Sequence, residues 1–303
     1  MTRTLAHRVV HGGNRYFETI LVTTGTIAEL RNLIPLALLL QPFPLKAMNL
    51  LFEQWPGMIQ VACFDTAFHR TAPKVEQILP PPYSAWKRGF HRYGFHDFSY
   101  GYMSHVLPEH LGNGASLYAM QNLQSVATTM DFSALAGLMM GTRTGSLDPS
   151  SLALPDGDRK TLAGRSGLHA LQPVRPARCF RGFCRTARGG EARGNPGEAG
   201  KHARIALALY VRRIVREIGA LTAVLGGLDP LVFTAGVGEN RAFVRERICR
   251  DLSFLGIRLN DAANAVHASI TYPDRGVRVD SAPTNEEWIA SIEACRLFHS
   301  KAS

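Results

Sequence analysis

The chain has 303 residues, of which 46% are hydrophobic and 19% are charged. This composition is ordinary for a globular protein and excludes a wholly disordered chain, a collagen and a coiled coil. The formal net charge is +10, but residues 159–204 carry eleven Lys and Arg against two acidic residues, so nine of the ten charges fall in this window. The sequence therefore predicts a near-neutral globular protein with one basic segment.

Five cysteines are scattered along the chain. Their number is odd and their spacing shows no disulfide framework, which is typical of a reducing compartment. The N-terminal residues contain no apolar stretch of the signal-peptide kind. The longest apolar run, residues 33–40, is interrupted by Pro35, and it is far shorter than the roughly 20 residues that span a bilayer. We therefore expect a cytoplasmic protein without a membrane partner.

The first 64 residues predict strands around a helical segment. Residues 1–23 predict strand, turn and strand, with the Gly-Gly-Asn cluster at 12–14 as a hairpin-like signal. Residues 25–55 predict helix with a proline interruption. Residues 58–64 (MIQVACF) form a short apolar run that ends at Asp65 and is typical of a buried strand.

The rest of the chain changes character twice. Residues 92–150 hold four polar, glycine-containing or turn-like clusters, whereas residues 151–200 are rich in Gly, Pro and Arg without helical or strand periodicity. The elements predicted after that are an amphipathic helix at 203–225, a strand at 231–234, a glycine turn at 235–240 and a helix at 241–255. Alternating strands and helices predict an α/β fold.

The segment TAGVGEN, residues 234–240, connects a predicted strand to a predicted helix through glycines. This is the geometry of many phosphate and nucleotide sites, because glycines let the backbone approach a ligand and the helix N-terminus offers free N–H groups. A plain turn between strand and helix explains the spacing equally well, since short Gly-x-Gly turns are weak signals.

Two arginines are placed where a guanidinium could grip a carboxylate or a phosphate. Arg143 lies between two glycines in the segment GTRTG, and Arg8 lies in the first predicted strand. The planar guanidinium suits such anions because it donates two parallel hydrogen bonds. An ordinary surface arginine fits both positions as well, so the residues alone leave the choice open.

Two acidic positions are candidate ligands for a cation. Asp65 closes an apolar run, which is where α/β folds place residues that face a ligand. Its carboxylate suits Mg²⁺, or it caps the following segment. Glu286 and Glu287 follow Thr284, and this spacing predicts a helix start that Thr284 caps.

His96 and Asn113 lie in glycine-rich turns and suit either turn formation or contact with a ligand. Cys179 and Cys184 lack a second pair of ligands, so no zinc site is predicted. The sequence contains neither a G-x-x-x-x-G-K-[ST] phosphate loop nor a G-x-S-x-G elbow.

Eight segments, taken in order, resemble the acetate kinase family. They are HRVVHGG (7–13), VACFDTAFH (61–69), RYGFH (92–96), HLGNGAS (110–116), LMMGTRTGSLDP (138–149), LDPLVFTAGVGENRAFVRE (228–246), LSFLGIRLN (252–260) and PTNEE (283–287). The resemblance implies two ribonuclease-H-like α/β domains of the actin-like ATPase superfamily, the first of them incomplete. It implies reversible phosphoryl transfer between ATP and acetate, giving ADP and acetyl phosphate, with Mg²⁺.

The resemblance also implies how the chain is divided. Residues 1–62 and 282–303 would form the N-terminal domain, to which the C-terminal helix returns. Residues 63–281 would form the nucleotide-binding domain, with an aberrant basic insert at 151–200. Members of the family pair through the second domain, which implies a homodimer.

Roles carry over from the resemblance position by position. Arg8 and Arg143 would grip the carboxylate and the transferring phosphoryl group, and Asp65 would orient the acetate or act with the metal. His96 would stabilise the equatorial oxygens of the transition state. The remaining implied residues are Val10, Leu39 and Phe95 in the substrate pocket, His110, Gly112, Asn113, Gly114, Gly236, Val237, Gly238, Glu239 and Asn240 around the nucleotide, and Glu286 at the metal. Propionate or butyrate as substrate stays open, because one methylene changes selectivity by only ~1–3 kcal/mol.

The chain also departs from the family pattern. It begins after the phosphate-cradling segment N-x-G-S-S-S-x-K, and Leu40 stands where a histidine is expected. Asp97 follows His96 in place of a glycine, and Tyr100 replaces a second histidine. The segment that contacts adenine in the family is replaced by residues 151–200. We therefore expect an impaired or inactive phosphotransferase, with a non-catalytic remnant of the family as the alternative.

Residues 151–200 match nothing in the family pattern and suggest a stretch that is read out of frame, a hypothesis that resequencing the gene would test. The competing interpretation is that residues 159–204 bind nucleic acid or another anionic surface. Phe180 and Phe183 are the only aromatic residues among the arginines between 175 and 193, which makes a poor stacking platform. We therefore do not expect nucleic acid to be the partner.

Overall fold

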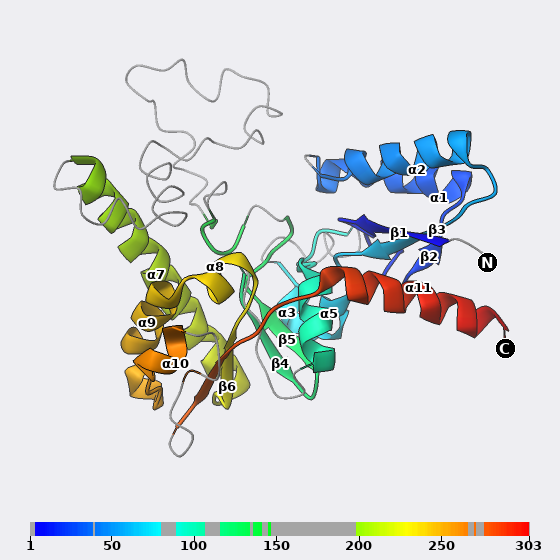
Figure 1. Cartoon of the computed structure of the whole chain (residues 1–303). Coiled ribbons are helices and arrows are strands. Elements are labelled where there is room, and N and C mark those ends of the chain that lie inside the picture. Colours follow the sequence, from blue (N-terminus) through cyan, green and yellow to red (C-terminus); the bar gives the residue numbers. More distant parts are fainter. Residues whose placement is uncertain are drawn as a thin grey trace.

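The computed structural model describes residues 4–38, 40–79, 89–106, 116–133, 136–140, 145–146, 198–265, 270 and 276–302 (Figure 1). Three small sheets organise these residues. Among the described helices, none has the length and apolar character that a membrane crossing requires. The basic insert lies outside the described residues up to 197, and its last three residues begin the helix α7.

The first sheet has the strand order β1-β3-β2, with β1 at Thr4–Val9, β3 at Ile59–Phe64 and β2 at Ile20–Leu21. β1 runs parallel to β3, and β2 runs antiparallel to it. The hairpin predicted for residues 1–23 is therefore wrong, because the two strands do not pair with each other. β3 is the most apolar of the three and is buried almost throughout, so it takes the central position and separates them.

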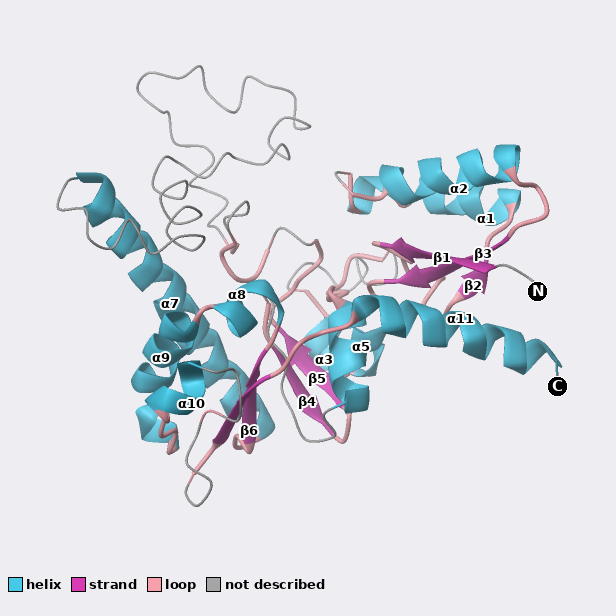
Figure 2. Ribbon diagram, in the orientation of Figure 1, coloured by secondary structure: helices cyan, strands magenta, loops and turns pink. Residues whose placement is uncertain are grey.

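Helices cover both faces of this sheet (Figure 2). α1 (Thr24–Arg31) and α2 (Pro42–Gln54) pack on one face, with a short 3₁₀ turn at Ile34–Leu36 between them. This confirms the predicted helical segment and its proline interruption. α11 (Glu286–Ala302), from the other end of the chain, packs on the opposite face together with α5 (Asp97–Val106).

Alternation along β3 separates the two cores of this region. Ala62 and Phe64 pack toward α1 and α2, whereas Val61 and Cys63 pack toward α5 and α11. Successive side chains of a strand point to opposite faces, so a strand that is apolar at every position can serve two layers at once. The C-terminal helix is thus attached to the first sheet by hydrophobic burial.

Between the two ends of the molecule lies an antiparallel pair, β4 (Tyr118–Gln121) and β5 (Gln124–Thr128). Asn122 and Leu123 connect these strands, and both have positive φ, as a two-residue hairpin turn requires. A 3₁₀ turn at Phe68–Thr71 packs against β5, and the short helix α3 (Lys74–Gln77) follows this turn along the chain.

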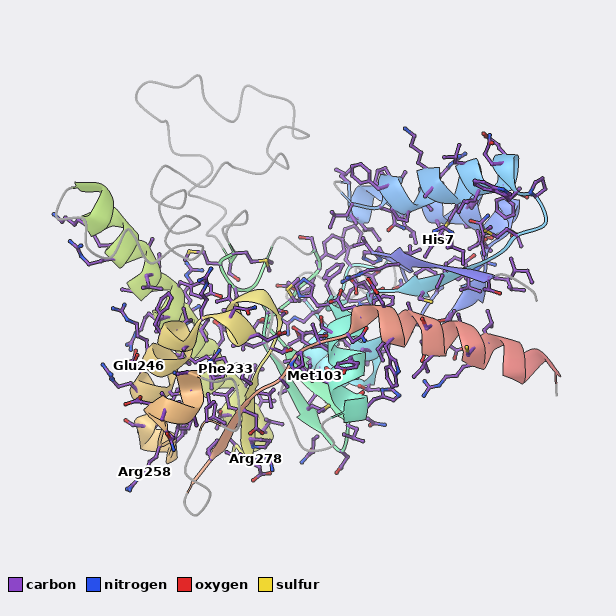
Figure 3. The ribbon with its side chains drawn as sticks, in the orientation of Figure 1. His7, Met103, Phe233, Glu246, Arg258 and Arg278 are labelled. Atoms are coloured by element: carbon purple, nitrogen blue, oxygen red, sulfur yellow. The ribbon has the colours of Figure 1, made fainter. Side chains whose placement is uncertain are left out.

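The third sheet pairs β6 (Pro230–Phe233) with β7 (Arg278–Ser281) in parallel. The helices around it are α7 (Glu198–Leu225), α8 (Ala235–Asn240), α9 (Ala242–Asp251) and α10 (Asp261–Ala265), with a 3₁₀ turn at Ser253–Leu255. Their apolar faces bury the largest core of the described residues, to which Ile214, Phe233 and Ile248 contribute. Figure 3 shows these side chains, with Phe233 marking the end of β6 and His7 marking the first sheet. The predicted helix at 203–225 and strand at 231–234 are confirmed to within a few residues.

The segment predicted as a glycine turn, residues 235–240, is the helix α8. Ala235 has φ +56°, and this left-handed residue turns the chain from β6 straight into a helical turn. Gly238 permits the close approach that follows, because a Cβ there would lie 3.2 Å from the carbonyl carbon of Phe233. The glycine signal therefore marked close packing of helix on strand rather than an open loop.

The predicted division into residues 1–62 with 282–303 and residues 63–281 stays a prediction. Its first boundary falls inside β3, which belongs wholly to the first sheet.

We expect Gly94→Ala to lower the free energy of unfolding by about 2 kcal/mol or more. Gly94 has φ +72°, and a Cβ there would lie 2.1 Å from Cδ2 of the buried His69. The matched control is Gly57→Ala, because Gly57 has nothing within 4 Å of the added Cβ. Urea unfolding of the two variants measures the difference, and equal midpoints would contradict the packing described for Gly94.

Candidate active site

Arg8 joins three elements in one cluster of charges. It lies in β1, Asp65 directly follows β3, and Glu286 begins α11. Arg8 Nη2 and Nε donate to Asp65 Oδ2 at 2.8 and 3.2 Å, and Arg8 Nη1 donates to Glu286 Oε2. Because β1 and β3 are parallel, their carboxyl ends lie at the same edge of the sheet, which is where ligands bind in α/β folds.

The carboxyl ends of the third sheet supply two further segments. α8, with residues 236–240, follows β6, and the chain that leaves β7 leads to Glu286. β6 and β7 are parallel, so α8 and the start of α11 leave the sheet at the same edge (Figure 1). Ala282 N donates to Phe233 O at 2.9 Å and fixes the path of the connection.

Burial controls the electrostatics of Asp65. It raises the pKa of Asp65, and the ion pair with Arg8 only partly opposes this, so the net direction is upward. Burial lowers the pKa of Arg8, but the two carboxylates outweigh it and the net pKa is raised. His96 is also near enough to act on Asp65, whose pKa it lowers when charged. The cluster is therefore a guanidinium held between two acidic groups with an imidazole close by.

The donor set of this cluster fits a magnesium ion. Asp65 Oδ1 is buried and has no hydrogen-bond partner among the described residues, although Oδ2 is occupied by Arg8. Mg²⁺ prefers oxygen ligands, and it binds through one or two carboxylates while water and phosphate complete its coordination. Within the described part of the chain no group of three His, Cys, Asp or Glu side chains forms a dedicated metal cage. Asp65 and Glu286 suit an ion that arrives with a phosphate.

His96 is held in an unusual backbone conformation at the start of α5. Its φ is +66°, which is uncommon for a residue with a side chain and typical of functional positions. Its Nδ1 lies 2.8 Å from Ser116 Oγ, and its carbonyl accepts a hydrogen bond from Tyr100 N at 3.2 Å. The sequence identified His96, but nothing in its turn motif indicated that Ser116 and Tyr100 would contact it.

The predicted substrate pocket is partly assembled. Phe95 is buried against Met130 and Met140, and Val10 packs on the same cluster. The two methionines were not predicted, although Met140 lies just before the GTRTG segment. The side chains form a small apolar surface that suits a short aliphatic group.

Asp97 and His69 form a buried pair that the sequence analysis did not identify. Asp97 Oδ1 and His69 Nε2 are 3.6 Å apart, and His69 Nδ1 lies 2.7 Å from Ser125 Oγ. Burial raises the pKa of Asp97 well above its ordinary value and lowers the pKa of His69 to about 3. Burial therefore keeps the His69 imidazole uncharged near pH 7 and favours the protonated form of Asp97. This pair fixes the start of α5 next to His96.

Arg245 was also missed, because an arginine in a helix normally indicates a solvated face. It is fully buried, and its guanidinium donates to Gly238 O at 2.7 Å and to Asn264 Oδ1 at 2.8 Å. Its hydrogen bonds to the α8 backbone hold the predicted nucleotide segment in place. The predicted cap of α11 is also different: Asn285 Oδ1, not Thr284, accepts from Trp288 N at 3.0 Å. This leaves Glu286 to bind Arg8 and Ser99 Oγ.

The structure brings together Arg8, Asp65, His96 and Glu286, and it places Val10 with Phe95. It places Gly236, Val237, Gly238, Glu239 and Asn240 on α8. The other predicted site residues lie outside the described residues, and they are Leu39, His110, Gly112, Asn113, Gly114 and Arg143.

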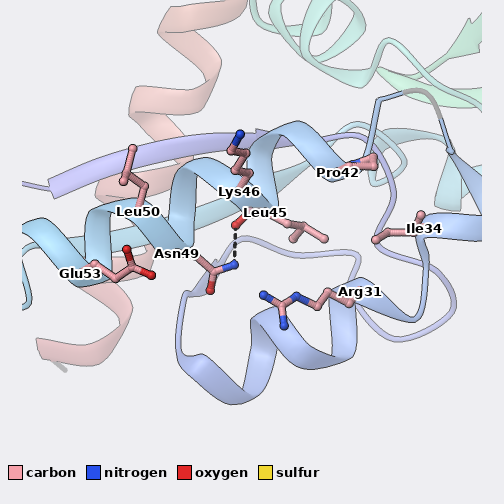
Figure 4. A pocket seen from close by; sticks show the side chains of 8 residues that line it. All are labelled: Arg31, Ile34, Pro42, Leu45, Lys46, Asn49, Leu50 and Glu53. Atoms are coloured by element: carbon pink, nitrogen blue, oxygen red, sulfur yellow. Dashed lines mark hydrogen bonds between the residues drawn. The ribbon is translucent and has the colours of Figure 1, made fainter.

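The described part of the chain has surface hollows, and two of them are large enough to compare with the predicted site. A groove of about 420 Å³ lies between α1 and α2 and is lined by Arg31, Leu45 and Lys46 among others (Figure 4). It shares no residue with the cluster around Arg8. A second cavity of about 270 Å³ lies between β3, α5 and α11, and Cys63 and Asp97 line it.

Comparison with known proteins gives a consistent result. The model of the Acetokinase family matches residues 2–291. The acetate kinase of Rickettsia akari is 38% identical over 314 residues, which cover 96% of this chain and 78% of that protein. The acetate kinase of Rhodopseudomonas palustris strain TIE-1 is 39% identical over 310 residues, which cover 97% of this chain and 76% of that protein.

Solved structures give the same picture. A propionate kinase from Francisella tularensis has a TM-score of 0.84 at 28% identity and is matched over 96% of this chain and 78% of its own. The acetate kinase of Porphyromonas gingivalis has a TM-score of 0.78 at 32% identity, with 97% of this chain and 78% of its own covered. The predicted α/β, actin-like ATPase fold class is confirmed.

We expect Arg8→Gln to destabilise the protein by about 2 kcal/mol at pH 8 and by less at pH 5. Breaking a buried pair leaves an uncompensated charge, and the cost here is below the usual ~3–5 kcal/mol because the Arg8 side chain is 40% exposed. Without Arg8 the raised pKa of Asp65 rises further. An acid with a raised folded-state pKa is stabilising below its unfolded pKa, and this stability is lost as the pH rises through the folded value.

The double variant Arg8→Gln with Asp65→Asn provides the control, because it removes the stranded carboxylate as well. Thermal unfolding at the two pH values should show recovery of stability at pH 8 in the double variant. An Arg8→Gln penalty that is independent of pH and unchanged by Asp65→Asn would contradict the ion pair.

Proposed function

The chain belongs to the Acetokinase family and is a kinase of the acetate kinase type, and from that premise we propose that it phosphorylates acetate or another short carboxylate with ATP. A carboxylate oxygen attacks the γ-phosphorus, the bond to the β–γ bridging oxygen breaks, and the electron pair leaves with ADP. The observation that carries the proposal is the cluster of Arg8, Asp65 and Glu286 at the carboxyl ends of β1 and β3, with His96 beside it.

Phosphoryl transfer needs positioning and neutralisation of charge more than covalent chemistry. Arg8 supplies a positive charge with a fixed orientation, because Asp65 and Glu286 hold both sides of its guanidinium. His96 supplies a ring N–H for an equatorial oxygen of the transferring group. Asp65 and Glu286 would hold Mg²⁺, which neutralises charge on the phosphate oxygens when it is bound.

The substrate would rest its alkyl group on Val10 and Phe95, and the nucleotide would lie along α8 at residues 236–240. We extend the proposal, on the family resemblance alone, to Arg143 at the phosphoryl group, to Leu39 in the pocket, and to residues 110–114 at phosphate. A homodimer and a cytoplasmic location also stay predictions.

We further propose that catalysis is weaker than the full family pattern would give. Leu40 occupies a position where the pattern has a histidine, and its exposed aliphatic side chain has no hydrogen-bond donor to offer a phosphate. Asp97 adds a buried acid where the pattern has a glycine, at the residue next to His96. Each missing donor to a transition state costs orders of magnitude in rate.

The direct test is formation of acetyl phosphate from ATP, Mg²⁺ and acetate, trapped as the hydroxamate. We expect a measurable rate that His96→Ala lowers by roughly 100-fold or more. The matched control is Arg258→Ala, because Arg258 is exposed and lies in another part of the molecule (Figure 3). Folded protein without any activity would contradict catalysis and favour a non-catalytic remnant. Equal rates in the wild-type and His96→Ala proteins would contradict the site.

We expect Val10→Ala to shift preference from acetate toward propionate or butyrate. Removing two methyl groups from the apolar surface leaves room for about one more methylene, which is worth ~1–3 kcal/mol in selectivity. The ratio of kcat/KM values should change by about tenfold in favour of the longer acid. An unchanged ratio would contradict the proposal that Val10 lines the substrate pocket.

A further inference from the structure

Two hydroxyl groups, those of Ser116 and Tyr100, are connected to the imidazole of His96 by consecutive hydrogen bonds. Ser116 Oγ is 2.8 Å from His96 Nδ1, and the same oxygen is hydrogen-bonded to the hydroxyl of Tyr100. Tyr100 and Ser116 are both fully buried. The two hydroxyl groups, from the first turn of α5 and the residues before β4, are therefore closed to solvent where they meet the partly buried imidazole of His96.

The backbone explains why these groups meet. Tyr100 lies in the first turn of α5, and its backbone N–H donates to the carbonyl of His96, which directly precedes the helix, at 3.2 Å. The Tyr100 ring is fixed by neighbours on several sides, with the Tyr118 ring centroid at 4.0 Å and the His69 centroid at 5.3 Å. Its hydroxyl cannot move far from Ser116.

Counting hydrogens assigns the donor and the acceptor in each of these two hydrogen bonds. A serine hydroxyl carries one hydrogen and a phenol carries one, and each buried hydrogen needs an acceptor. If Tyr100 donates to Ser116, and Ser116 donates to His96 Nδ1, both hydrogens are used. If His96 Nδ1–H donates instead, one hydrogen has no acceptor among the described residues: the phenol hydrogen if Ser116 donates to Tyr100, or the serine hydrogen if Ser116 accepts from both neighbours. A buried donor without a partner loses its hydrogen bonds to water and gains none in return, so the first arrangement is favoured.

We propose that Tyr100, acting through Ser116, fixes His96 as the tautomer whose proton is on Nε2. Tyr100 and Ser116 are then positioning residues, and His96 Nε2 is a preset donor to an oxygen of the transferring phosphoryl group. The tautomer follows from the contacts alone, and only its use in catalysis rests on the proposed function. Tyr100 departs from the family pattern, so this protein fixes the tautomer of His96 through a phenol that the pattern lacks.

The tautomer is measured directly by NMR of protein labelled with ¹⁵N-histidine, with the His96 signals assigned by their loss in His96→Gln. We expect protonated Nε2 and unprotonated Nδ1 in the wild-type protein near pH 8. In Ser116→Ala, and to a smaller extent in Tyr100→Phe, a mixture of both tautomers should appear. Tyr118→Phe is the matched control, because it removes a buried phenol hydroxyl that is not hydrogen-bonded to Ser116 or His96. It should leave the His96 signals unchanged.

Kinetics supply the second measurement. We expect Tyr100→Phe to lower kcat by about tenfold with little change in the KM for acetate, because the imidazole keeps its place and loses only its preset proton. Protonated Nδ1 in the wild-type protein would overturn the proposal even if a variant failed to fold, and so would a tautomer that neither variant changes. If His96 carries Nε2–H and responds to the variants but no reaction occurs, the positioning role of Tyr100 and Ser116 stands and the proposed function falls.

Discussion

The ion pair of Arg8 with Asp65 is the interaction on which the rest of the site depends. It connects β1 to β3 at the edge where ligands bind, and through Glu286 it reaches the helix that returns from the end of the chain. A carboxylate as buried as Asp65 is stable in its charged form only with such a partner. In the proposed function, the same guanidinium therefore supplies charge for phosphate chemistry and helps to attach α11.

A second constraint acts through α5, where His96 is placed by what surrounds it. Gly94 allows the backbone to pass against His69, the buried pair of His69 and Asp97 lies at the first turn, and Ser116, which is hydrogen-bonded to Tyr100, contacts the imidazole. These buried polar contacts rigidify the segment that bears the imidazole.

The sequence predicted those features that depend on local pattern. Amphipathic spacing identified α7, an apolar run identified β3, and the order of short motifs identified Arg8, Asp65, His96 and Glu286. It did not predict contacts made across the fold. The hairpin of residues 1–23 was wrong because β3, far along the chain, pairs with both strands. Arg245 was missed because its hydrogen-bond partners lie in α8 and α10, which only the fold brings to it.

The most direct test of the central claim is a crystal structure of the protein with ADP, Mg²⁺, aluminium fluoride and acetate, which together mimic the transferring phosphoryl group. The account predicts that the aluminium fluoride lies between an acetate oxygen and the β-phosphate, with Arg8 and His96 Nε2 within hydrogen-bond distance of its fluorine atoms. It also predicts that Asp65 and Glu286 lie beside the magnesium and that the nucleotide lies along α8. Binding of these ligands away from the carboxyl ends of β1 and β3 would contradict it.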